Sequence, residues 1–97
     1  MSDWLYPEAV QRVEKACTFF LLGQLNVEDL QTALYQSEQE IEAFEEKWLR
    51  SLLFEAENKL EEIIYMVSSG QQKEVMVAIV HKLLSDIHNR KDHPPAA

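Results

Sequence analysis

Three histidines and a single cysteine are among the side chains whose types could bind a metal ion or act as a nucleophile. His81 and His88 are seven residues apart, so on one helix they share a face with their backbones about 10 Å apart. Histidine pairs that bind zinc on a helix are four residues apart instead. His93 lies close to the end of the sequence. We therefore predict no metal site.

The sequence also offers few residues or motifs for catalysis or cofactor binding. Cys17 cannot form a disulfide within the chain, and it falls on the apolar stripe of its predicted helix, so we interpret it as a core residue rather than a reactive thiol. The sequence contains no Gly-rich phosphate loop, no Cys-x-x-Cys pair and no Glu-x-x-His spacing of di-iron bundles. We predict no catalytic residues and no cofactor. A small enzyme or metal binder is the weakest alternative.

The composition indicates which elements must position the other side chains. The chain has only two glycines and three prolines, and the prolines lie near its ends. Both residues interrupt helices, so nearly the whole interior can be helical. Pro7 suits the first turn of a helix that Gly23 would end, and Asn26 is the predicted N-cap of a second helix over 27–36. We expect Trp4 and Tyr6 to fix the first helix to the bundle.

A third helix is predicted from Glu38 because residues 37–40 match the capping-box pattern, although the second helix could instead run on without a break. This helix would reach about Val67, a length of roughly 45 Å. A fourth helix is expected over 71–89. The sequence thus predicts an all-α protein, an antiparallel helical bundle of about four helices with one long central helix. Residues 1–90 would form one domain, and residues 91–97 a flexible tail.

A continuous apolar stripe runs along the third predicted helix, and its width would allow contact with two neighbouring helices. Leu49, Leu53 and Ile64 widen this stripe on one side. A second copy of the chain is an alternative occupant for part of the stripe. The stripe comprises Ile41, Phe44, Trp48, Leu52, Ala56, Leu60, Ile63 and Val67.

Charge and hydropathy limit the class of partner. The net charge of −8 argues against direct binding of nucleic acid and fits a basic protein partner, although acidic surfaces also simply maintain solubility. No apolar run approaches the roughly 20 residues of a membrane span. The first residues lack the pattern of a signal peptide. We therefore expect no membrane association and a cytoplasmic location.

The acidity is concentrated in residues 37–62, where nine glutamates and three cations give a net charge of −6. On a helical wheel, Phe54 and Tyr65 fall away from the apolar stripe. An aromatic pair flanked by charged residues is typical of the core and rim of a protein interface. Alternatively, another helix or the tail covers Phe54. The predicted partner-binding residues are Lys47, Arg50, Phe54, Glu57, Asn58, Glu61 and Tyr65.

Several segments together resemble small all-helical immunity proteins of bacterial toxin–immunity systems of the contact-dependent growth inhibition type. The resemblance extends from about Trp4 to Ile87 and includes a final helix. Its helix-start and amphipathic patterns occupy 6–10, 25–30, 37–41, 45–50 and 60–67. These patterns contain no catalytic motif, so the resemblance implies a role and assigns no individual residue.

That role is to bind one toxin domain and block its action. The expected partner is a cognate, basic protein toxin domain, most simply a nuclease whose cationic cleft an acidic helix can occupy. Binding beside the active site is a second possible mode. The alternative to an immunity protein is a structural adaptor or small chaperone-like helical module that associates with itself, so a homodimer is compatible with the sequence.

Overall fold

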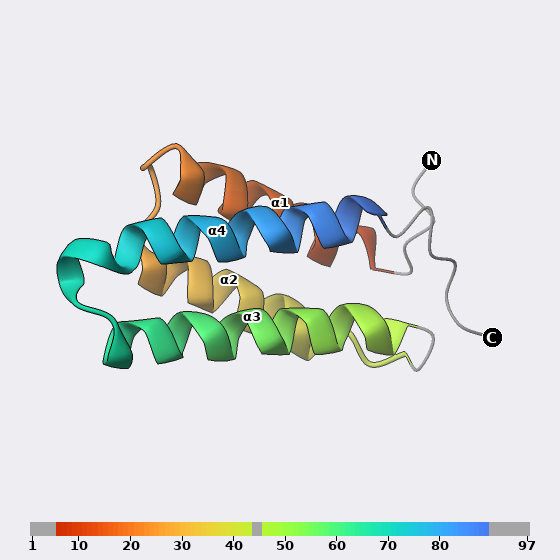
Figure 1. The fold of residues 1–97 in the computed structure, drawn as a ribbon. Helices are drawn as coiled ribbons and strands as arrows, with labels where there is room; N and C mark the ends of the chain where they lie inside the picture. The colour runs from red at the N-terminus through yellow and green to blue at the C-terminus, as the bar shows by residue number, and fades with distance from the viewer. Residues whose placement is uncertain (1–5, 44–45, 90–97) are drawn as a thin grey trace.

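The computed structural model describes residues 6–43 and 46–89. It contains four helices, α1 (Pro7–Leu21), α2 (Val27–Glu40), α3 (Lys47–Met66) and α4 (Ser69–His88). The helices form an antiparallel bundle in which each packs against its neighbour in sequence, and α1 also contacts α4 (Figure 1). The predicted all-α bundle is confirmed. The predicted tail, residues 91–97, lies outside the described residues, as do Trp4, Phe44 and His93.

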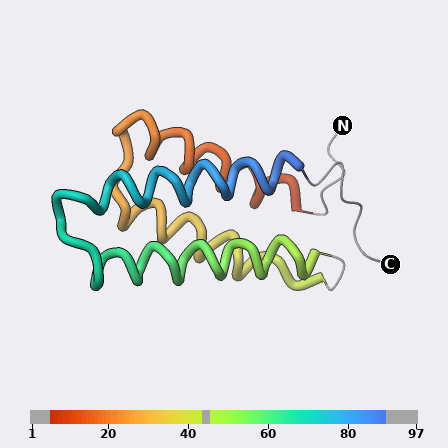
Figure 2. The backbone as a smooth tube through the Cα atoms, viewed as in Figure 1, coloured from red at the N-terminus to blue at the C-terminus, as the bar shows by residue number. Residues whose placement is uncertain are grey.

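The chain reverses direction between each pair of helices. The turns between α1 and α2 and between α3 and α4 lie at one end of the bundle, and the α2–α3 connection lies at the other (Figure 2). The molecule measures 42 × 23 × 23 Å. None of the helices in the described ranges is long and apolar enough to cross a membrane.

Local chemistry explains where the first two helices begin and end. Pro7 occupies the first turn of α1, and Gly23 follows α1 with a φ of 77°, a conformation that glycine adopts at little cost. The Asn26 side chain accepts a hydrogen bond of 2.8 Å from the backbone N–H of Asp29, which caps α2. These three signals were predicted from the sequence and are confirmed.

The junction between α2 and α3 differs from the prediction. Helix α2 continues to Glu40, and α3 begins at Lys47 rather than at Glu38. Ser37 caps no helix; its buried hydroxyl donates to the Ala9 carbonyl oxygen at 3.3 Å. The capping-box pattern was therefore misleading, because burial against α1 gives Ser37 a partner that local sequence does not reveal.

Tyr6 connects the start of α1 to the segment after α2. Its hydroxyl oxygen accepts hydrogen bonds from the backbone N–H groups of Glu42, at 3.2 Å, and Ala43, at 2.9 Å. Arg12 adds a second link between these helices through a 2.8 Å ion pair with Glu40. The predicted role of Tyr6 in fixing the first helix to the bundle is confirmed.

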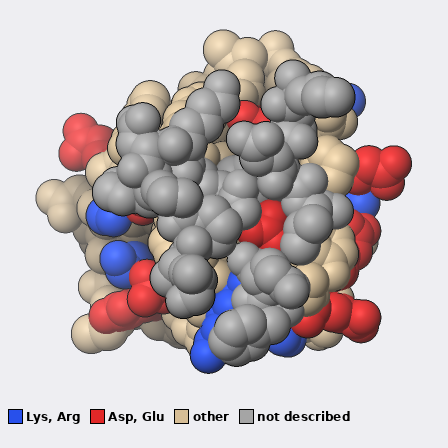
Figure 3. Space-filling model, turned by 90° about the vertical axis from the view of Figure 1, so that its right-hand side faces the viewer, with Lys and Arg blue, Asp and Glu red and all other residues tan. Residues whose placement is uncertain are grey.

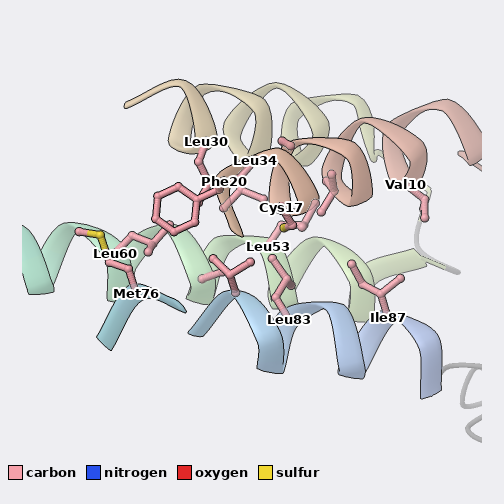
Figure 4. Packing of buried hydrophobic residues seen from close by; sticks show 14 of the residues in the cluster. Val10, Cys17, Phe20, Leu30, Leu34, Leu53, Leu60, Met76, Leu83 and Ile87 are labelled. Carbon is pink, nitrogen blue, oxygen red and sulfur yellow. The ribbon is translucent and has the colours of Figure 1, made fainter. Parts of the chain in front are cut away.

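The core consists of apolar side chains from all four helices (Figure 4). Cys17 is completely buried among them, as predicted. On α3, Leu49 and Leu53 are fully buried, whereas Trp48, which was predicted to face inward, is 45% exposed. The wide apolar stripe of α3 is thus used inside the chain, because α2 and α4 both pack against it. The largest fully buried apolar side chains are Leu30, Leu34, Ile41, Leu49, Leu53 and Leu60.

Candidate functional site on the outer face of α3

The outer face of α3 carries all seven residues that the sequence predicted to bind a partner. Phe54 is 54% exposed and Tyr65 is 79% exposed, so no other part of the described chain buries either ring. Six of the seven are exposed, and Glu57 is partly buried. The six exposed residues are Lys47, Arg50, Phe54, Asn58, Glu61 and Tyr65.

Helical spacing places these side chains in one line. Lys47, Phe54 and Glu61 are seven residues apart, as are Asn58 and Tyr65, and seven residues make almost two turns. Along this line a basic residue, Lys47, comes first, the aromatic Phe54 follows it, and the acidic Glu61 precedes a second aromatic residue, Tyr65. We call this line the outer stripe of α3, defined by Lys47, Phe54, Asn58, Glu61 and Tyr65.

A pair of glutamates lies beside this stripe, where α2 meets α3. Glu38 on α2 is only 6% exposed, and its carboxylate oxygen Oε2 lies 3.9 Å from Nε of Arg50 on α3. The amide nitrogen Nε2 of Gln39 donates to the same oxygen at 3.1 Å. Glu38 also forms a side-chain hydrogen bond with Glu57 of α3. Glu38 thus contacts two residues of α3 that lie two turns apart.

The hydrogen bond between Glu38 and Glu57 requires a proton. Burial, a hydrogen bond with Glu38 and the negative charge of Glu38 together raise the pKa of Glu57 to about 8, and burial is the largest of the three causes. Oε2 of Glu57 is buried and no donor in the described chain binds it, so a charged carboxylate there would be left unsatisfied. A protonated Glu57 can donate to the Glu38 carboxylate, so at neutral pH the two acids form a link between α2 and α3.

The exposed surface of α3 is less acidic than the sequence predicted. Of the nine glutamates in residues 37–62, Glu38 and Glu46 are buried and Glu57 is partly buried. The exposed charges of α3 are balanced, with three cations and three carboxylates. At the end of the bundle near the α2–α3 connection, the visible acidic and basic side chains are also interspersed around the rim (Figure 3). The exposed charges of α3 are Lys47, Arg50, Lys59, Glu55, Glu61 and Glu62.

Tyr35 of α2 is an exposed aromatic residue that sequence reasoning did not include. It is 56% exposed and lies three residues before Glu38. Because α2 and α3 are antiparallel and Glu38 lies level with the segment between Arg50 and Glu57, Tyr35 lies about level with Glu57. A helical wheel of α2 could have placed Tyr35 relative to Glu38, but only if the predicted helix had been continued through Glu38.

The other groups with possible chemistry have structural roles. His88 Nε2 lies 3.1 Å from a carboxylate oxygen of Glu14, which connects α4 to α1. Phe19 is 36% exposed, and the Lys15 ammonium lies 5.8 Å from its ring centroid. Within residues 6–43 and 46–89, no group of three His, Cys, Asp or Glu side chains could hold a metal ion.

The outer stripe of α3 combines exposed aromatic side chains with flanking charges of both signs. In comparisons with protein-family models, curated proteins and solved structures, nothing matches this chain.

Proposed function

We propose that this chain is an immunity protein that binds a cognate toxin domain and neutralises it by forming a stoichiometric complex. The contact surface is the outer stripe of α3, extended by Arg50 and Glu57 of the same helix and by Tyr35 of α2. The observation that carries the proposal is the exposure of Phe54 and Tyr65 in the middle and at one end of this stripe.

Exposed aromatic rings are the kind of residue that supplies most of the energy of a protein interface. Phe54 and Tyr65 are held about three turns apart on a 20-residue helix, so little backbone freedom is lost when a partner covers them. Asn58 lies between them and can donate and accept hydrogen bonds at the centre of the contact. The rings would slow dissociation of the complex.

The charges of the stripe suggest how the partner is oriented. Glu61 and the adjacent Glu62 would face a cationic part of the toxin, such as a cleft that binds phosphate groups. Lys47 and Arg50 would face an acidic part about 20 Å further along the helix. The net charge of −8 accelerates the approach of a basic partner over longer distances. An active site that binds nucleic acid would be blocked when its cationic residues pair with the acidic end.

The test is protection from a toxin domain encoded beside this chain. Co-expression of the two proteins should restore growth, and the purified proteins should form a one-to-one complex. Phe54→Ala and Tyr65→Ala should each weaken that complex about 30-fold or more, because truncation of an interface hot spot costs about 2 kcal/mol or more. Phe19→Ala on α1 is the matched control and should bind normally. Failure to protect, or unchanged affinity of both α3 variants, would refute the proposal.

A further inference from the structure

The outer stripe of α3 is self-complementary in charge. Lys47 lies seven residues before Phe54, and Glu61 lies seven residues after it. Phe54 is therefore at the midpoint between a basic and an acidic end of the same exposed line. Asn58 and Tyr65 continue the line, and nothing in the described chain buries the two rings.

A two-fold axis through Phe54 brings these features into register. A second copy whose α3 runs in the opposite direction would place Lys47 of each copy opposite Glu61 of the other. Phe54 would pack against its symmetry equivalent, and Arg50 would face Asn58. Such an isologous contact forms the Lys47–Glu61 pair twice, once on each side of the axis, and leaves Arg50 opposite a neutral side chain. A parallel arrangement would instead oppose like charges.

We infer that the free chain forms an antiparallel homodimer in which the outer stripes of two α3 helices pack against each other. This contact differs from self-association through the apolar stripe of α3, since α2 and α4 occupy that stripe within the chain. One helix on each side gives a contact area below that of standard stable interfaces. The dimer is therefore weak, and its population depends on concentration.

The geometry of the bundle leaves the outer stripe accessible to a second copy. Helix α3 packs against both α2 and α4, and Ala56 lies on the side of α3 that faces Ile79 and Leu83 of α4. Lys47 also has an interaction within its own chain, and the dimer requires only its positive charge at this end of α3.

Charge exchange tests the antiparallel register. In sedimentation experiments over a concentration series, the wild-type chain should change from monomer to dimer. Lys47→Glu or Glu61→Lys alone would create two like-charge contacts and should weaken the dimer at least tenfold. The double variant Lys47→Glu/Glu61→Lys should restore dimerisation. Lys73→Glu, a matched change on an exposed residue of α4, should have no effect.

A cysteine at the axis gives an independent readout. Phe54→Cys should form an intermolecular disulfide on mild oxidation, whereas Lys73→Cys should not. Cys17 does not interfere, because it is fully buried. A chain that stays monomeric at all concentrations, or a double variant that fails to recover, would overturn the inference.

This inference does not depend on the proposed function, because the experiments use the isolated protein. A monomeric chain that protects against the toxin would overturn only the dimer. A dimer that binds no toxin would overturn only the immunity role. If both hold, toxin and second copy compete for Phe54, and the toxin should convert the dimer into one-to-one complexes.

Discussion

Replacing Glu57 by glutamine tests the acid pair that connects α2 to α3. Glutamine has the shape of a protonated glutamate, and its amide can donate a hydrogen bond to the Glu38 carboxylate at every pH. The wild-type side chain can donate only while it carries its proton. Glu57→Gln should therefore keep the link between the helices and remove its dependence on pH.

The sign and size of the effect follow from the pKa of Glu57, which the fold raises from 4.5 to about 8. Between these values the folded chain retains a proton that the unfolded chain has lost, so the free energy of unfolding falls as pH rises and levels off above about pH 8. Without solvent screening, a pKa difference of about 3.5 would lower the free energy of unfolding by roughly 4.8 kcal/mol. Because Glu57 is partly exposed, solvent screening reduces this, and we expect a loss of about 1–2 kcal/mol.

Urea unfolding followed by circular dichroism at pH 5, 7 and 9 measures this loss. The wild-type midpoint should fall as pH rises, whereas that of Glu57→Gln should change less and be higher than wild type at pH 9. Glu61→Gln removes the same charge from an exposed position and controls for net charge. The comparison is repeated with His88→Gln, which removes the imidazole that lies beside Glu14. A pH dependence of Glu57→Gln equal to that of wild type would refute the protonated link.

Four other substitutions or reactions test the fold. Leu53→Ala removes a completely buried side chain and should lower the free energy of unfolding by about 2–5 kcal/mol in urea titrations; a loss below 1 kcal/mol would contradict its central position. Asn26→Ala should cost about 1 kcal/mol through loss of the α2 cap, whereas Asn26→Gly should cost less. Gly23→Ala should cost about 1–2 kcal/mol from its positive φ alone, since no atom lies within 4 Å of the added methyl group, and thermal unfolding would detect it. Burial and nearby Glu14 raise the pKa of Cys17 to about 12, so a thiol reagent should modify it only at the rate of unfolding, and rapid modification of the native chain would contradict this.

The starts of α1 and α2 and most of the core were predictable from sequence because they depend on residues close together in the chain. Pro7 and Asn26 act within one turn, and the periodicity of α4 identifies Met76 and Leu83 as buried. A helical wheel also placed Phe54 correctly on the side away from the core. Such predictions need no knowledge of which helices are neighbours.

The α2–α3 junction and the acid pair were not predictable in the same way. Ser37 follows a local capping pattern, but its partner is the carbonyl of Ala9, 28 residues away. Glu38 was counted among the nine glutamates that make residues 37–62 acidic, whereas its burial beside Glu57 and Arg50 follows only from the packing of α2 against α3. Five of the nine glutamates in residues 37–62 precede α3, because this helix begins at Lys47, so the sequence overstated the acidity of α3.

Two backbone amides donate hydrogen bonds to the Tyr6 hydroxyl, so their hydrogen exchange reports when the start of α1 moves away. The N–H groups of Glu42 and Ala43 follow α2, and their acceptor is a phenol 36 or 37 residues earlier in the chain. Their exchange with solvent deuterium therefore requires the start of α1 to separate from this segment, whereas amides inside a helix exchange when that helix opens. Comparing the two classes of amide would separate undocking of α1 from unwinding of the bundle, without any label attached to the protein.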